Sequence, residues 1–286
     1  MKLDTCFLCK SDEYITLHKG TRGGHNDIDV LKCAKCGLVR LSESMDDSMS
    51  FYENSGMRKC AGELIGDLRI STRKDDERRY LFAENMIEGK ALLDFGCGDG
   101  GFLLRAKEIA KYVEGVELEA EIRRQINEEG IVCKKSLADT GKFDVITAFH
   151  VLEHLENPLT YLAEMKKHLV PSGMLLLEVP NADDALLKLY QSSAFADFTY
   201  WHCHVYLYTN ATLAELAKQA GFKVVFIEQV QRYPLANHLH WLAKGKPGGH
   251  HVWTYLQDDA LDKAYGDKLA GLGMADTIIA GFAALS

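Results

Sequence analysis

From residue 91 onward, short apolar runs alternate with segments in which apolar and polar residues follow a helical period. The apolar runs predict buried strands at 91–95, 112–117, 131–134, 143–149 and 174–179. The amphipathic segments between them predict helices at 101–111, 119–129 and 157–169. This alternation is typical of an α/β fold in which helices cover a parallel sheet.

The pattern continues with a helix at 212–220, a strand at 222–230 and a final apolar run at 277–283. The stretch between the last two strands is too long for a hairpin, which indicates an insertion at about 231–275 that could form part of a lid. Residues 41–90 are rich in charged residues and contain a helix-forming run at 75–87, so we expect a helical connector there. Residues 1–40 predict a small separate module, and residues 91–286 the main domain.

Composition and charge narrow the classes of function. The net charge of −8 argues against a protein that mainly binds nucleic acid, because phosphate contacts need a surplus of Lys and Arg. No stretch approaches the roughly 20 apolar residues that cross a bilayer, and the first residues lack the apolar core of a signal peptide. We therefore expect a cytoplasmic protein with no membrane partner, in which thiols stay reduced.

Four of the eight cysteines form two tight pairs, Cys6 with Cys9 and Cys33 with Cys36. In a reducing compartment, two C-x2-C pairs indicate metal ligation rather than disulfide bonds. Zn²⁺ takes four thiolates in a tetrahedral set, and this closed shell makes the site structural. Metal bonds can replace the core that a 40-residue module cannot bury. The alternative is four unrelated core cysteines.

A glycine-dense turn follows the first strand of the main domain, in the run Leu92-Leu93-Asp94-Phe95-Gly96-Cys97-Gly98-Asp99-Gly100. Glycine allows positive φ angles and lets a ligand approach the backbone closely, and the amides that open the next helix can receive a carboxylate. The alternative for the turn is a tight strand-to-helix connection. Glu117 ends the next strand, where an acid can accept hydrogen bonds from both ribose hydroxyls of an adenosine. Asp94 can bond turn amides or meet the ammonium group of the ligand.

The order of these motifs with F-D-V-I-T-A-F-H-V-L-E-H and P-S-G-M-L-L-L-E-V-P-N resembles class I S-adenosylmethionine methyltransferases. The resemblance covers roughly residues 85–230 and implies a Rossmann-like, seven-stranded sheet with the last strand antiparallel. It implies a cofactor site for S-adenosylmethionine, with these residues and roles: Asp94, Gly96, Cys97 and Gly98 around the methionine part, Glu117 on the ribose, Leu118 beside the adenine, and Phe149 and His150 closing the methionine side. A nicotinamide dehydrogenase is disfavoured because the usual third spaced glycine is missing.

A zinc module ahead of such a core resembles two groups of methyltransferases. One group comprises the sugar C-methyltransferases that act on nucleotide-linked deoxysugars, with their carbohydrate-cluster relatives. The other comprises ribosomal-RNA guanine methyltransferases. The first 40 residues contain seven Lys/Arg and five Asp/Glu, a small excess of positive charge for binding RNA. The four-cysteine pattern and the run Cys36-Gly37-Leu38-Val39 favour the first group.

Methyl transfer to a hydroxyl or a carbon acid requires removal of a proton, for which histidine is a natural base. His202 and His204 follow the fifth core strand, and the sugar C-methyltransferases have Tyr-His-Glu-His at the corresponding place. Here Trp201 stands for the tyrosine and Cys203 for the glutamate, which leaves transfer to oxygen or nitrogen open. We expect His204 or His202 to be the base, with Trp201 and His154 near the acceptor. The alternative is that these histidines pack structurally.

The insertion offers further candidates for binding the acceptor. They are Arg232, Asn237 and His238, and the two lysines beside glycines, Lys244 and Lys246. Lysines next to free glycine amides can hold a phosphate, as in a nucleotide sugar, although a solvated turn between helices has the same composition. The sequence thus predicts methyl transfer to a small-molecule acceptor, which can be phosphorylated or nucleotide-linked. The alternatives are an RNA base methyltransferase and a zinc-bearing scaffold or sensor without turnover.

Overall fold

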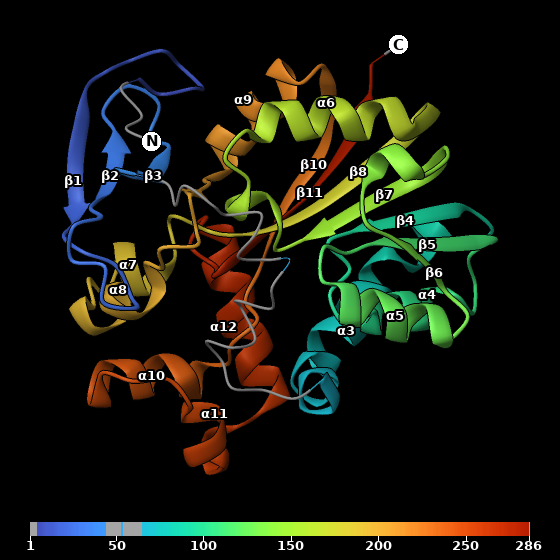
Figure 1. Ribbon diagram of the computed structural model, residues 1–286. Helices are drawn as coiled ribbons and strands as arrows, with labels where there is room; N and C mark the ends of the chain where they lie inside the picture. Colours follow the sequence, from blue (N-terminus) through green and yellow to red (C-terminus); the bar gives the residue numbers. More distant parts are fainter. Residues whose placement is uncertain (1–4, 44–52, 54–64, 286) are drawn as a thin grey trace.

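The computed structural model describes residues 5–43, 53 and 65–285. A seven-stranded sheet forms its centre, in the order β10-β11-β8-β7-β4-β5-β6 (Figure 1). The strands are β4 (Ala91–Phe95), β5 (Tyr112–Val116), β6 (Val132–Lys134), β7 (Phe143–Phe149), β8 (Leu169–Pro180), β10 (Phe222–Val230) and β11 (Thr277–Ala284). Strands β4 to β8 pair in parallel, whereas β11 is antiparallel to both of its neighbours. The predicted Rossmann-like sheet with an antiparallel last strand is confirmed.

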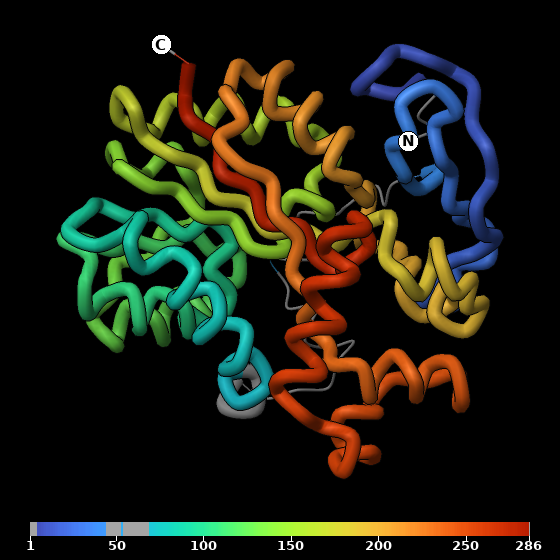
Figure 2. The backbone as a smooth tube through the Cα atoms, turned by 180° about the vertical axis from the view of Figure 1, so that it is seen from behind, coloured from blue at the N-terminus to red at the C-terminus, as the bar shows by residue number. Residues whose placement is uncertain are grey.

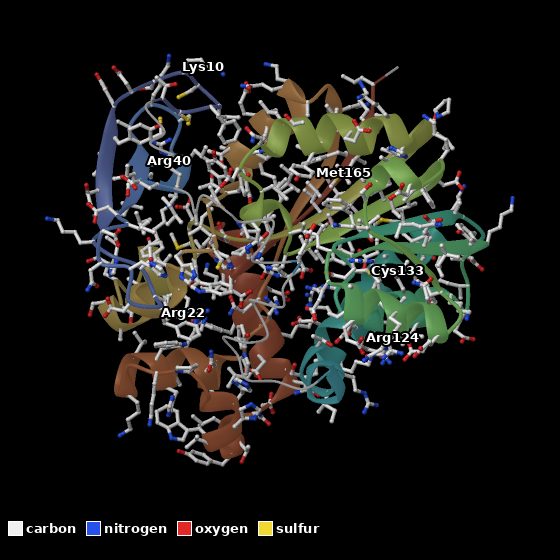
Figure 3. The ribbon with its side chains drawn as sticks, viewed as in Figure 1. Lys10, Arg22, Arg40, Arg124, Cys133 and Met165 are labelled. Carbon is white, nitrogen blue, oxygen red and sulfur yellow. The ribbon has the colours of Figure 1, made fainter. Side chains whose placement is uncertain are left out.

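Helices cover both faces of this sheet, as Figures 1 and 2 show from opposite sides. One face carries α6 (Pro158–His168) and α9 (Asn210–Gln219). The other carries α3 (Ile65–Ile87), α4 (Gly101–Ala106) and α5 (Ala120–Glu128). Successive residues of β8 point to opposite faces, so Leu175 and Leu177 join one core while Leu176 joins the other. Met165 of α6 and Cys133 of β6, both labelled in Figure 3, belong to these two cores respectively.

A second, four-stranded sheet has the order β1-β2-β3-β9. Its first three strands are β1 (Tyr14–His18), β2 (Val30–Cys33) and β3 (Val39–Leu41), and β9 (Tyr206–Leu207) comes from the main domain. The ring of Phe7 packs edge-on against Tyr206 at 4.9 Å between centroids. The N-terminal residues are therefore joined to the main domain by backbone pairing and by a shared core. The division at residue 40 stays a prediction.

The predicted insertion is helical. It contains α10 (Leu235–Lys244), α11 (Gly249–Val252), a 3₁₀ turn η3 (Thr254–Leu256) and α12 (Asp259–Gly271). Four shorter elements complete the described chain: η1 (Leu137–Asp139), η2 (Leu152–His154), α7 (Ala185–Lys188) and α8 (Ser193–Thr199). In Figure 1, α10 and α11 lie at the opposite end of α12 from the strands.

Some element bounds differ from the prediction. Helix α4 ends at Ala106, because turns at residues 107–110 replace its predicted last turn. Strand β8 begins at Leu169, ahead of the predicted strand at 174–179, and its register against β7 is irregular. The predicted connector includes α3, while residues 44–52 and 54–64 lie outside the described residues. No helix in the described ranges is both long and apolar enough to span a membrane.

Candidate active site

The glycine turn joins β4 to α4 at the carboxyl end of the sheet. Gly96, Gly98 and Gly100 have φ angles of +73°, +53° and +76°. A side chain at Gly96 would also place its Cβ 2.5 Å from Cγ2 of Val151, closer than atoms can approach. The amides of Gly96 and Cys97 both donate to the carbonyl of Val116 at the end of β5. Positive φ angles and close packing thus explain why this turn needs glycine.

Glu117 follows β5 and lies against the glycine turn. Its Oε2 accepts a hydrogen bond from the amide of Gly98 at 3.1 Å, and its Oε1 accepts one from the amide of Glu119 at 2.9 Å. The side chain is partly exposed, as is the neighbouring Leu118. Each carboxylate oxygen can accept a second hydrogen bond. The two bonds hold the carboxylate against the glycine turn.

Asp94 lies under the turn and is almost fully buried. Its Oδ1 accepts a hydrogen bond from the hydroxyl of Thr147 on the neighbouring strand at 2.7 Å. Burial raises the pKa of Asp94 to about 7, although the bond from Thr147 acts in the opposite direction. This carboxyl group therefore changes its charge near neutral pH. We call Asp94, residues 96–100 and Glu117 the donor side of the site.

His150 follows the end of β7 in a left-handed conformation, with a φ angle of +55°. Its ring lies between two fully buried carboxylates, with Nδ1 3.1 Å from Glu153 and Nε2 3.2 Å from Glu178. Burial and Arg232 lower the pKa of His150, but the two carboxylates outweigh them and the pKa is raised. Phe149, the residue before it, packs edge-on against Phe102 of α4. Such strain in a residue other than glycine is common at functional sites.

Arginines from α3, which the sequence pattern did not predict as site residues, complete this cluster. Arg78 and Arg79 both donate to Glu178 of β8, each with a bond of 2.8 Å. Burial alone would raise the pKa of Glu178, but Arg79 and the other cations hold it well below its usual range. Arg232 pairs with Asp75 of α3 and reaches Nε2 of His150 at 3.1 Å. The position of Glu178 within an apolar strand could have indicated these arginines, because a buried charge needs charged partners.

A second group of side chains lies on the other side of Glu153. His154 comes from η2 and His204 from the segment before β9, and their rings are 4.9 Å apart between centroids. Trp201 packs edge-on against both rings, at 6.2 Å and 5.4 Å. We call Glu153, His154, Trp201 and His204 the acceptor side of the site. His204 and Trp201 also line a small cavity with Arg40 and Tyr200.

The two candidate bases have different surroundings. Nδ1 of His202 lies 3.0 Å from the backbone carbonyl oxygen of Arg22, and its ring lies 4.2 Å from that of His25. Since a carbonyl oxygen only accepts, Nδ1 of His202 is the donor in this bond. Burial and the neighbouring His154 lower the pKa of His204 to about 3, so its ring is neutral at pH 7. His204, and not His202, belongs to the acceptor side.

The remaining candidates of the insertion lie elsewhere, apart from Arg232. Asn237 accepts hydrogen bonds at Oδ1 from the amides of Gly248 and Gly249, which fixes the start of α11. His238 is buried and bonds Tyr265 of α12 through Nδ1 at 2.8 Å. Lys244 and Lys246 are exposed at the end of α10. Their predicted contact with the acceptor stays a prediction.

The four paired cysteines lie together near the N-terminal sheet. Their sulfur atoms all lie within 4.8 Å of one another, with 3.6 Å between Cys6 and Cys36 and 3.4 Å between Cys9 and Cys33. None of the four is in a disulfide. Bonds of about 2.3 Å to a central Zn²⁺ would place tetrahedral sulfur atoms about 3.8 Å apart. The donor set therefore fits the predicted zinc ion.

Comparison with known proteins identifies the family of the chain. A family model described as a methyltransferase domain matches residues 68–227, more than half of the chain. A ubiquinone biosynthesis O-methyltransferase of Glaesserella parasuis is 29% identical over 134 residues, which cover 41% of this chain and 54% of that protein. The corresponding protein of Burkholderia pseudomallei is 24% identical over 173 residues, or 55% of this chain and 75% of that protein. The first match thus spans about half of the length of that relative.

Solved structures share the fold. Magnesium protoporphyrin IX methyltransferase from Synechocystis PCC 6803, solved with bound S-adenosylhomocysteine, has a TM-score of 0.52 and 13% identity, covering 83% of this chain and 98% of its own. An S-adenosylmethionine-dependent methyltransferase from Archaeoglobus fulgidus has a TM-score of 0.50 and 18% identity, covering 79% and 97%. At these identities the likeness extends to the fold alone.

Proposed function

The chain belongs to the methyltransferase-domain family and is an S-adenosylmethionine-dependent methyltransferase; from this premise we propose that it methylates a hydroxyl oxygen of a small polar acceptor. We propose a sugar or a nucleotide-linked sugar as the acceptor. The observation that carries the proposal is the segment after β7, which contacts both sides: Val151 packs against Gly96 of the donor side, and His150 pairs with Glu153 of the acceptor side.

On the donor side, we propose that the carboxylate of Glu117 accepts hydrogen bonds from the ribose hydroxyls of the cofactor. Its existing bonds to the amides of Gly98 and Glu119 support this role, because they hold the carboxylate in place. We propose that the charge of Asp94 attracts the ammonium group of the methionine part. When bound, the cofactor supplies an electrophilic methyl group. The residues of the chain hold it in line with the acceptor oxygen.

On the acceptor side, we propose that His204 orients the hydroxyl that receives the methyl group. His202 is less suited, because its ring packs against His25 and the loop of Arg22, outside the acceptor side. Cys203 stands where the sugar C-methyltransferases have glutamate, and its carbonyl accepts a hydrogen bond from His154. Without that carboxylate, removal of a proton from carbon has less support, which favours transfer to oxygen. The names of the O-methyltransferase relatives also favour transfer to oxygen.

We further propose that the four-cysteine cluster holds one structural Zn²⁺. Four thiolates leave no position for water, so the ion would stabilise the N-terminal sheet without entering the reaction. The pairing of β3 with β9 would pass this stability to the segment that carries His204. The zinc site thus supports the acceptor side from a distance.

The experiment is a measurement of S-adenosylhomocysteine formation with a panel of acceptors. The panel contains nucleotide-linked sugars, free sugars, catechols and hydroquinones, and total RNA. We expect turnover with a sugar or a nucleotide-linked sugar, and mass spectrometry should place the new methyl group on oxygen. Turnover with RNA alone, or a methyl group on carbon, would contradict the proposal.

A matched pair of variants tests the histidines. We expect His204→Ala to lower kcat by at least about tenfold, because it removes the group that orients the acceptor. His202→Ala should change kcat less, since this ring packs against the loop of Arg22. The opposite order of effects would move the acceptor contact to His202.

A further inference from the structure

Three side chains of the acceptor side form a cluster with the composition of a metal site. Glu153 and His154 come from η2, directly after β7, and His204 comes from the segment before β9. One ligand atom of each lies within 4.8 Å of the other two. In the described parts of the chain, the four-cysteine cluster is the other group of this kind.

Two atoms of the cluster are buried without a hydrogen-bond partner among the described residues. They are Oε2 of Glu153 and Nδ1 of His204. Glu153 has no exposed surface at all. A buried carboxylate oxygen without a partner is costly, and in folded proteins such an atom commonly marks an ion or a water that completes it. The unpartnered atoms point to a cation between these side chains.

The outer contacts of the cluster hold its side chains in the orientation of metal ligands. Nδ1 of His154 donates to the backbone carbonyl of Cys203 at 2.8 Å, so Nε2 is the nitrogen that carries a lone pair. The other oxygen of Glu153, Oε1, is held by Nδ1 of His150 at 3.1 Å. Histidine and carboxylate ligands of metals are usually oriented by bonds of this kind.

We propose that Glu153, His154 and His204 bind one divalent ion of the first transition series, such as Zn²⁺, Co²⁺ or Fe²⁺. Two imidazole nitrogens and one carboxylate oxygen suit these ions. Bonds of about 2.1 Å would bring tetrahedral ligand atoms to about 3.4 Å from one another, which small rotations of the three side chains achieve. The ion would also supply the positive charge that Oε2 of Glu153 lacks.

Three ligands from the protein leave at least one coordination position open. Catalytic metal sites keep such a position for water or substrate, in contrast to the closed shell of four cysteines. We infer that an oxygen of the acceptor takes this position beside Trp201. This last step rests on the proposed function, whereas the binding of the ion does not.

The test is a titration with Co²⁺ of the full-length protein carrying a single equivalent of Zn²⁺, which the four thiolates retain, followed by calorimetry and visible absorption. Cobalt that enters the four-cysteine cluster produces a thiolate charge-transfer band, so absorption separates the two sites. We expect one equivalent of Co²⁺ to bind without that band. In His204→Ala we expect affinity for this equivalent to fall by at least about tenfold, because loss of a ligand costs no less than loss of an outer contact.

His202→Ala is the matched control, two residues from the proposed ligand, and should bind Co²⁺ like the unaltered protein. Glu153→Gln removes the negative charge of the proposed carboxylate ligand and tests the same site. If this variant does not fold, His204→Ala provides the test of the ligands. Binding of S-adenosylhomocysteine by each variant reports that the donor side is intact. Absence of this cobalt equivalent, or equal loss in His204→Ala and His202→Ala, would overturn the metal site and leave methyl transfer untouched.

Discussion

The donor side and the acceptor side of the active site are built in different ways. The donor side comes from one continuous strand–turn–helix–strand unit, and its contacts are mostly to backbone amides, as in the bond from Gly98 to Glu117. The acceptor side joins η2 to a segment about fifty residues later, and its contacts are between side chains. A backbone-built site depends on glycines at fixed places. A site built from side chains can change its chemistry through single substitutions.

The largest expected effect concerns the donor side. Gly96→Ala should lower the affinity for S-adenosylhomocysteine by about 100-fold or more, because it adds a clash with Val151 to the strain of a left-handed residue. Gly98→Ala is the matched control, since its φ angle is also positive but its Cβ would meet no atom within 4 Å. We expect a loss of about tenfold there, from strain of 1–2 kcal/mol alone. Calorimetry measures both, and equal losses would show that packing against Val151 is unimportant.

The next effect should separate the two sides. Cys33→Ser removes a proposed zinc ligand, so we expect the loss of one equivalent of metal. Turnover should fall by about tenfold or more, because β3 of the N-terminal sheet pairs with β9, next to the segment that carries His204. Affinity for S-adenosylhomocysteine should stay within about threefold. Cys133→Ser, outside the cluster, should retain the metal. If Cys33→Ser also abolished cofactor binding, the two sides would not be independent.

A smaller effect is the pH dependence of the donor side. The pKa of Asp94 is raised to about 7, so its carboxyl is mostly neutral at pH 6 and mostly charged at pH 8. A charged Asp94 attracts the ammonium group of the cofactor, and affinity should therefore rise about tenfold from pH 6 to pH 8. Asp94→Asn should bind more weakly at pH 8 and lose most of this dependence. A flat profile in the unaltered protein, measured by calorimetry, would contradict the role of Asp94.

The smallest expected effect lies outside both sides. Lys244 and Lys246 are exposed at the end of α10, where solvent screens their charges. We expect the double variant Lys244→Ala, Lys246→Ala to change kcat/KM by less than about twofold with any acceptor. A large rise in KM for phosphorylated acceptors alone would instead assign a phosphate to these lysines.

The sequence predicted the donor side better than the acceptor side for a physical reason. Apolar runs and positive-φ glycines are local features, so the strands and the turn at Gly96 could be predicted from neighbouring residues. The proximity of Glu153 to His204 depends on how distant segments pack, which one sequence does not contain. The contacts of Arg78 and Arg79 with Glu178 also depend on the packing of distant segments. The single acid in an apolar strand indicated only that cations must lie nearby.

The N-terminal region shows the same limit. The spacing of its cysteines predicted a compact four-sulfur cluster, and the structure places the four sulfur atoms together. Nothing in residues 1–40 indicated that Tyr206 and Leu207 would supply the fourth strand of its sheet. Pairing of strands far apart in the chain follows from the packing of the whole domain.

That borrowed strand has a consequence for how the protein is made. As the chain leaves the ribosome, β1 to β3 emerge early, but their outer edge at β3 stays uncovered until residues 206–207 have been synthesised. An open strand edge is prone to pair with other chains. We therefore expect a fragment that stops before β9 to aggregate, even when its cysteines are loaded with metal.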